Sequence, residues 1–254
     1  MTLVVAAKIA RREMRGGLGG FTVFLLCLIL GVAAIAAVGT VRDSIRAALD
    51  EQGAVLLGGD AQASFTYRPA APDERAYLEG LPTRISEIYD FRSMAVAGQG
   101  DSTIRALTQV KSVDDAYPLV GTVDLDPPLT LTDALAGGGA VLDGVLADRM
   151  GLQPGGTFRL GTATFTYRAR LLREPDSATG GFGLGPRSIV RTADLAASGL
   201  LEPGTLYDTR YRMTLPQGAD LPALEAAAEA RFRDQGLRGR DSRDGAPGGG
   251  RFVE

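Results

Sequence analysis

The sequence predicts an α+β fold in which one N-terminal transmembrane helix is followed by a mixed α+β domain. Three observations lead to this prediction. No charged residue lies between Gly16 and Val41, a distance long enough to cross a bilayer as a helix. The rest of the chain mixes segments of alternating polarity, typical of strands, with segments of helical periodicity. The 34 glycines and 13 prolines of the chain provide turns between these segments.

The membrane segment is the first element to justify. Residues 21–38 are almost wholly apolar, and about 20 such residues span the hydrocarbon core as a helix, the only single-segment structure that satisfies its own backbone there. We therefore predict a transmembrane helix with its stalk over residues 19–52, ending at Gly53. The positions expected to form the membrane anchor are Phe21, Leu25, Leu28, Gly31, Ala34 and Val38.

The charged residues before this segment predict its orientation in the membrane. Four basic residues precede it against the single acidic Glu13, namely Lys8, Arg11, Arg12 and Arg15. By the positive-inside rule the N-terminus stays cytoplasmic and the long following domain is exported. The spacing of the four residues also places them on one face of a helix, so residues 1–18 are predicted to form an amphipathic helix at the membrane surface. An unstructured basic flank is the alternative.

A cleavable signal peptide is the main rival to the anchor. Small residues at 34–36 and 37–39 fit a cleavage site. Signal peptides, however, have a shorter apolar region of about 7 to 15 residues. The length of this one favours an uncleaved anchor.

The exported domain is predicted over residues 53–242. Alternation and short apolar runs predict strands at 55–57, 61–67, 85–97 with a break near Asp90, 102–110, 140–142, 157–160, 164–172 and 207–215. Helical patterns with start and stop signals predict helices at 72–81, 145–150, 193–197 and 221–233. This order argues for α+β and against a doubly wound parallel sheet.

Composition excludes several kinds of site. The chain has no histidine, which removes histidine-ligated metals and Ser-His-Asp catalysis, and the lone Cys27 can form neither a disulfide within the chain nor a cysteine cluster. The glycine-rich residues 180–185 lack the Gly-Lys-Ser/Thr of a phosphate-binding loop. We expect no cofactor, no metal and no nucleic-acid partner.

Two carboxylate pairs were the remaining candidates for metal binding or catalysis. Asp114 and Asp115 are adjacent, and side chains adjacent on a strand point to opposite faces. Asp124 and Asp126 alternate, but prolines follow where a calcium loop needs a glycine turn and more oxygen ligands. Solvent-exposed acids are the favoured interpretation of both pairs.

Four stretches resemble one protein family: residues 10–15, 110–121, 145–161, and 174–176 together with 185–187. The chain is similar to the N-terminal part of bacterial ABC-transporter permeases of the FtsX-like, MacB-type superfamily. It most resembles the large permeases with two exported domains, relatives of the lipoprotein-releasing permeases. The most specific stretch runs from Lys111 to Pro118, and Gly156 departs from the family pattern. The family-motif positions are Asp114, Asp115, Tyr117, Pro118, Pro186 and Arg187.

The resemblance implies a fold and a function. The exported domain would be a MacB-like periplasmic core domain, and the protein would reside in the bacterial inner membrane. It would transmit movement from a separate cytoplasmic ABC ATPase subunit to its periplasmic domain, so this chain would not itself be an enzyme. Membrane lipid is an expected partner, and lipid-like or lipoprotein cargo is the expected substrate class.

The family comparison also bears on the length of the chain. Residues 243–254 would begin the connection to a second transmembrane helix that this sequence lacks, so we expect a fragment of a longer permease. Two alternatives from other classes are a stand-alone, single-pass periplasmic binding or scaffold protein and an exported hydrolase. A Gly-x-Ser-x-Gly sequence, which would favour a hydrolase, does not occur.

Overall fold

The computed structural model describes residue 5 and residues 18–98, 100–176, 185–196, 198–202, 204–216, 218–232 and 237–241. The chain divides into two compact units, Met1–Leu49 and Asp50–Glu254. Helix α2 (Leu18–Leu57) is continuous, and its Thr22–Arg42 part is long and apolar enough to cross a membrane. The predicted basic helix over residues 1–18 falls almost wholly outside the described residues.

Helix α2 is longer than predicted. It does not end at Gly53, and residues 55–57, predicted as a strand, form its last turn. The amide of Gly58 donates to the carbonyl of Ala54 at 2.9 Å, and the side chain of Leu57 is fully buried. Burial of this last turn outweighs the cost of about 1 kcal/mol for a glycine inside a helix.

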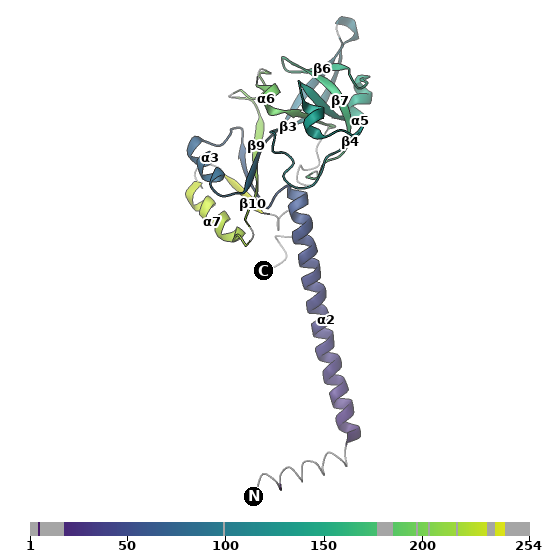
Figure 1. Cartoon of the computed structure of the whole chain (residues 1–254), viewed down its shortest axis with the longest axis vertical. Helices are drawn as coiled ribbons and strands as arrows, with labels where there is room; N and C mark the ends of the chain where they lie inside the picture. Colours follow the sequence, from purple (N-terminus) through teal and green to yellow (C-terminus); the bar gives the residue numbers. More distant parts are fainter. Residues whose placement is uncertain are drawn as a thin grey trace. The chain divides into compact units, whose positions relative to one another are not determined.

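The second unit is a mixed sheet flanked by short helices (Figure 1). Its strand order is β10-β1-β9-β2-β3-β8-β5-β7-β4, with β6 bridging β2 and β7. Two pairs, β3 with β8 and β5 with β7, are parallel, and the others are antiparallel. The strands are β1 (Ala61–Thr66), β2 (Arg84–Ala97), β3 (Ile104–Val113), β4 (Asp124–Asp126), β5 (Gly139–Asp143), β6 (Thr157–Leu160), β7 (Ala163–Arg173), β8 (Arg187–Arg191), β9 (Tyr207–Thr214) and β10 (Arg238–Asp241).

The helices of this unit are short. They are α3 (Pro72–Glu79), the 3-10 helix η1 (Gly100–Ser102), α4 (Leu131–Leu135), α5 (Gly144–Met150), α6 (Thr192–Leu195) and α7 (Leu221–Phe232). Figure 1 shows α3 and α7 together beside β9 and β10, and α5 beside β7. Local sequence sets their ends: Pro72 begins α3, the Asp143 carboxylate accepts from the amide of Val145, and Gly151 ends α5 with φ 63°.

The apolar core has separate clusters along the sheet. One lies beneath α3 and α7 and includes Phe65, Tyr211 and Phe232. A larger one, around α5 and the β6–β7 hairpin, includes Leu142, Phe158 and Phe165. A smaller cluster packs around α4. The predicted α+β class is confirmed, because the domain combines helices with one sheet of mostly antiparallel strands.

The predicted break near Asp90 is wrong, because β2 runs unbroken through it. Asp90 is buried and its carboxylate is paired with two arginines, so a charge in mid-strand is compensated without interrupting the ladder. The strand predicted over 102–110 begins and ends later, as β3. The hairpin across Gly161 and the helix ended by Gly151 are confirmed.

Close packing of α4 on β5 generates a test of the fold. A Cβ added at Gly139 would overlap the backbone carbonyl oxygen of Ala134. We therefore expect Gly139→Ala to destabilise the domain by about 1 to 3 kcal/mol, measured by urea unfolding followed by tyrosine fluorescence. Gly80→Ala is the matched control, because its Cβ would meet the carbonyl oxygen of Tyr77 at an ordinary 3.5 Å. Equal stability of the two variants would contradict this packing.

Candidate functional site

The second unit has a row of buried charges on one face of its sheet, where an ordinary core would be apolar. Strands β1, β9, β2, β3 and β8 lie side by side. Pairing places Asp90 opposite Lys111 and Gln62 opposite Arg212. We call the bonded group the ionic network, and its members are Gln62, Asp90, Lys111, Tyr117, Glu174, Asp176, Arg187, Arg210 and Arg212.

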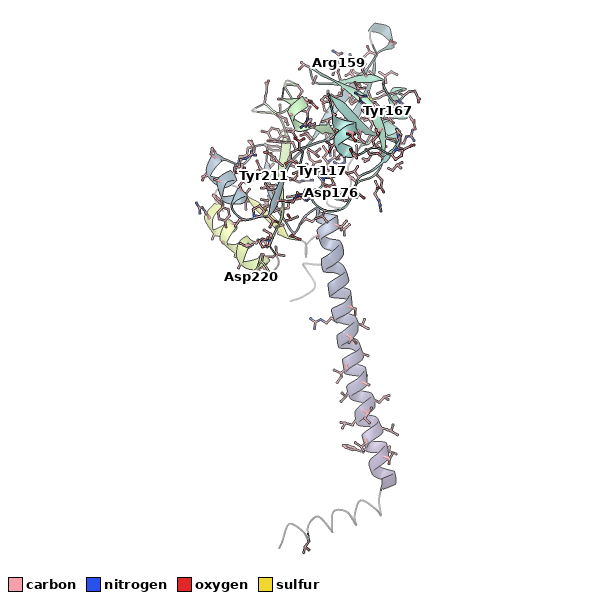
Figure 2. All side chains as sticks on the ribbon, in the orientation of Figure 1. Tyr117, Arg159, Tyr167, Asp176, Tyr211 and Asp220 are labelled. Atoms are coloured by element: carbon pink, nitrogen blue, oxygen red, sulfur yellow. The ribbon has the colours of Figure 1, made fainter. Side chains whose placement is uncertain are left out.

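Lys111 is the centre of this network. Its ammonium nitrogen lies 2.8 Å from a carboxylate oxygen of Glu174 and 2.7 Å from one of Asp176. It also lies 3.2 Å from the hydroxyl of Tyr117, which itself donates to Asp176 at 2.7 Å. Figure 2 labels Tyr117 and Asp176, which lie next to each other. These bonds satisfy the donors of a lysine that is only 1% exposed.

Arginines extend the network to both sides. Asp90 accepts from Arg187 and from Arg210, each at 2.9 Å. Arg187 also lies 3.0 Å from the second carboxylate oxygen of Glu174. Arg212 is paired with Asp176 and donates to the side-chain oxygen of Gln62 at 3.4 Å. The network therefore interleaves cations and carboxylates, the arrangement that burial of charge requires.

Burial and pairing act in opposite directions on the pKa values. Burial lowers the pKa of Lys111 to about 7, although Glu174 favours the charged amine. Burial also lowers the pKa of Arg212. For Asp90, burial alone would raise the pKa, but the charges of Arg210, Lys111 and Arg187 outweigh it and hold the pKa below its ordinary value.

One donor of the network has no bonded partner among the described residues. The second terminal nitrogen of Arg212, Nη2, is buried without a hydrogen bond there. With every group ionised, Lys111 and the three arginines outnumber the carboxylates of Asp90, Glu174 and Asp176. In this fully ionised state the network is positive by one charge, and any carboxylate lost from it leaves a second uncompensated cation.

The last turn of α2 meets the network within the second unit. Gly58 follows the helix with φ 79°, and a Cβ there would lie 2.5 Å from Nη1 of Arg212. A Cβ at Gly59 would lie 2.8 Å from the carbonyl oxygen of Met213. Only glycine permits this close approach of the chain to β9. We call residues 57–59 the joint.

A second contact holds the segment that carries the two central acids. At Gly121, with φ 80°, an added Cβ would lie 2.6 Å from Pro175 and 3.6 Å from Val55 of the last turn of α2. Pro175 separates Glu174 from Asp176. Val55 of the helix end and Pro175 of the acidic segment thus both lie next to Gly121, and Gly58 directly after the helix lies against Arg212.

The family-motif positions fall in and beside this network. Tyr117 and Arg187 are members of it, and Pro118 follows a cis peptide bond. The Asp114 carboxylate accepts from the hydroxyl of Ser86 and the amide of Glu87, each at 2.7 Å, and so fixes the turn after β3.

The other two positions have peripheral roles. Asp115 is exposed and pairs with Arg191 at 2.6 Å, and such exposed pairs contribute little stability. The carbonyl of Pro186 accepts from the hydroxyl of Thr108 at 2.9 Å and the amide of Gln109 at 3.0 Å. Pro186 therefore helps to pair the start of β8 with β3.

The remaining predicted residues lie elsewhere. Leu25, Leu28 and Val38 are exposed on α2, and Gly31 has no neighbour within 4 Å of an added Cβ. Phe21 and Ala34 also belong to α2. The basic positions Lys8, Arg11, Arg12 and Arg15, and residues 180–184 of the glycine-rich stretch, lie outside the described residues. Asp124 forms an exposed ion pair with Arg173, and Asp126 is exposed.

Sequence reasoning missed four members of the network: Gln62, Asp90, Arg210 and Arg212. The strand over residues 207–215 was predicted from its alternation, and its charged face reads as solvent-exposed by that pattern. A strand in the middle of the sheet has both of its faces covered, and this is the signal that would have indicated buried charges on it. Knowing this requires the strand order, which a local pattern does not contain.

The chain combines an apolar helix of membrane-spanning length with a mixed α+β domain that buries a network of charges. These features define the class of protein: a domain attached to a membrane-type helix. A family model described as the MacB-like periplasmic core domain matches residues 21–231. The chain belongs to this family.

Two kinds of relative illustrate the relationship. The chain is 31% identical over 188 residues to an uncharacterised ABC transporter permease, YbbP, of Escherichia coli K12, covering 74% of this chain and 22% of that protein. The chain thus spans about a fifth of the length of this relative. Solved structures with a similar fold include the periplasmic region of MacB from Actinobacillus actinomycetemcomitans (TM-score 0.48, 10% identity, 74% of this chain and 92% of that one). Another is the extracellular domain of YknZ from Gram-positive bacteria (TM-score 0.47, 11% identity, 71% and 100%).

The ionic network predicts a large effect for a small change. Asp176→Asn removes one carboxylate charge beside Lys111 and Arg212, and we expect a loss of about 3 to 5 kcal/mol in the free energy of unfolding. Asp124→Asn makes the same chemical change in an exposed pair and should cost at most about 1 kcal/mol. Urea unfolding in mild detergent measures both. Similar losses in the two variants would show that the network does not stabilise the domain.

The network also predicts an acid limit. Because the folded pKa of Asp90 is below its ordinary value, its carboxylate stabilises the fold at pH values above about 4 and loses this effect as pH falls through the folded pKa. We expect the wild-type urea midpoint to fall as the pH is lowered below about 4. Asp90→Asn should be less stable at neutral pH and show a flatter decline. Parallel pH curves would contradict the assignment.

Proposed function

We propose that this chain is the N-terminal segment of an ABC-transporter permease of the mechanotransmission type. In this proposal a separate cytoplasmic ATPase closes on ATP, helix α2 transmits the movement, and the periplasmic domain acts on lipid-like or lipoprotein cargo. Family membership and the permease relative support the transporter class. The observation that carries the mechanical part is the joint, where the helix end packs on the ionic network.

The joint suits the transfer of force. A continuous helix is stiff along its axis, whereas a glycine-rich linker would absorb movement. Here the two glycines after α2 do not act as a free linker, because Gly58 faces Arg212 and Gly59 faces Met213 at distances that leave no room for a side chain. Displacement of the helix end would therefore move β9 and the acidic segment at residues 174–176.

The proposal assigns roles to the parts of the chain. Residues 1–18 form the amphipathic helix on the cytoplasmic surface, and residues 19–52 form the membrane helix and stalk. Residues 53–242 form the periplasmic core domain, and residues 243–254 begin the connection to a second membrane helix. In this orientation the N-terminus is cytoplasmic, and ATP hydrolysis takes place in the partner subunit.

The test uses the full-length gene product in lipid nanodiscs with the ABC ATPase encoded beside it. We expect the two to copurify, and ATP binding to change hydrogen exchange in residues 53–60 and 174–176. Gly58→Val should retain the ATPase but lose at least half of this ATP-dependent change, because the side chain displaces Arg212 from the joint. Gly80→Val, remote from the joint, is the control for a β-branched residue at a helix end.

Two results would overturn the proposal. Absence of ATPase association would leave a single-pass anchored scaffold as the better interpretation. Association with an unchanged exchange response in Gly58→Val would retain the permease class and remove the mechanical role of the joint.

A further inference from the structure

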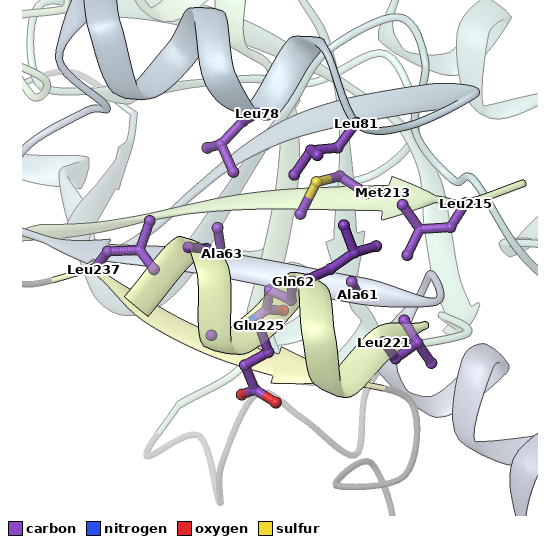
Figure 3. A pocket seen from close by; sticks show the side chains of 13 residues that line it. Ala61, Gln62, Ala63, Leu78, Leu81, Met213, Leu215, Leu221, Glu225 and Leu237 are labelled. Atoms are coloured by element: carbon purple, nitrogen blue, oxygen red, sulfur yellow. The ribbon is translucent and has the colours of Figure 1, made fainter. Parts of the chain in front are cut away.

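A separate apolar pocket lies on the opposite side of β1 and β9 from the ionic network, beneath α3 and α7 (Figure 3). The space inside it has a volume of about 50 Å³. Figure 3 shows Leu78 and Leu81 on one wall and Leu221 on the other, with Met213 and Ala63 between them. This volume leaves room for a few methylene groups and is well below the volume of sites that enclose a whole small molecule, about 300 to 1,000 Å³.

The pocket exists because α7 packs on the sheet mainly through its C-terminal end. Phe232 is buried and its ring centroid lies 5.3 Å from that of Tyr77. At the other end of the helix, Leu221 and Leu224 line the pocket, and neither belongs to the buried cluster beneath α3 and α7. Two leucines are thus presented to a hollow that the protein's own side chains do not fill.

The pocket has few polar groups. Gln62 and Glu225 are the only polar side chains among its described lining residues. The Gln62 amide donates to Ser64 at 3.0 Å and accepts from Arg212. The Glu225 carboxylate lies against Gly239, 3.1 Å from the position of an added Cβ, and in Figure 3 it points away from Leu78 and Leu81.

This lining selects the chemistry of an occupant. A sugar or an anion would lose hydrogen bonds to water without replacement. A peptide strand would leave its backbone donors and acceptors unpaired for the same reason. A flexible alkyl chain has no such groups, and each buried methylene strengthens binding about fourfold. Such chains are also plentiful around a protein with a membrane-spanning helix.

We propose that the pocket formed by β1, β9, α3 and α7 binds the end of the alkyl chain of a single-chain amphiphile. The site does not depend on the transport proposal, because its walls come entirely from the exported unit and its occupancy requires no ATPase. The chain would enter along Leu221 and Leu224 and lie over Ala63 and Met213, with its head group left in water.

The test is photo-cross-linking of the chain in lipid nanodiscs, since detergent would compete for the same pocket. The probe is a long-chain fatty alcohol with a diazirine near the end of its alkyl chain, and mass spectrometry locates the labelled residues. We expect labels on α3, β9 and the first half of α7. If the wild-type protein is labelled only within its membrane span, that result by itself overturns the proposal.

A matched pair of variants tests whether the pocket itself holds the probe. Ala228→Phe fills the pocket from α7, and Ala227→Phe makes the same change one position along, on an exposed residue. Loss of contact with about two methylenes in Ala228→Phe should reduce labelling about fifteenfold. Ala227→Phe should label like the wild type. Equal labelling of both variants would show that the alkyl chain does not occupy this pocket.

Discussion

The buried ionic network is the constraint on which the domain depends. Removing charges from water costs several kcal/mol per ion, and only close opposite charges and hydrogen bonds offset that cost. The partners here are distant in sequence, from Asp90 on β2 to Arg212 on β9, with Glu174 and Asp176 on the segment after β7. They meet only when the sheet register is correct. The network therefore penalises every misregistered sheet, beyond what it contributes to stability itself.

Local sequence predicted many of the elements but not β4, α4, β8 or β10, and it missed the long-range arrangement. Residues 207–215 alternate clearly, and Gly151 marks a helix end, because periodicity and cap residues act over a few positions. The burial of Arg210 and Arg212 depends instead on the strands on either side of β9. The same limit explains the wrong prediction for residues 55–57. Their apolar pattern fits either a strand or a helix end, and the buried environment of Leu57 favours the helix end.

Part of the site was nevertheless foreseeable from the family motif, and the structure gives that motif a physical meaning. Lys111 and Tyr117 reach the same carboxylate because the chain turns back after β3. Asp114 fixes this turn by accepting from the strand beside it. Asp115, its neighbour, points to solvent. Two adjacent aspartates in one motif thus contribute unequally to the structure, and a sequence pattern alone does not distinguish them.

Strand β9 links the two proposed activities, because adjacent residues on it face opposite sides of the sheet. Arg212 meets the joint and the ionic network, whereas Met213 lines the apolar pocket. The backbone of Met213 also touches Gly59 directly after the helix. A shift of the helix end would thus press on β9 at the wall of the pocket. Leu221 and Leu224 of α7 line the pocket but lie outside the buried cluster beneath α3 and α7, whereas Arg212 is paired with Asp176. In the proposed mechanism the pocket side of β9 is therefore the side expected to change shape first.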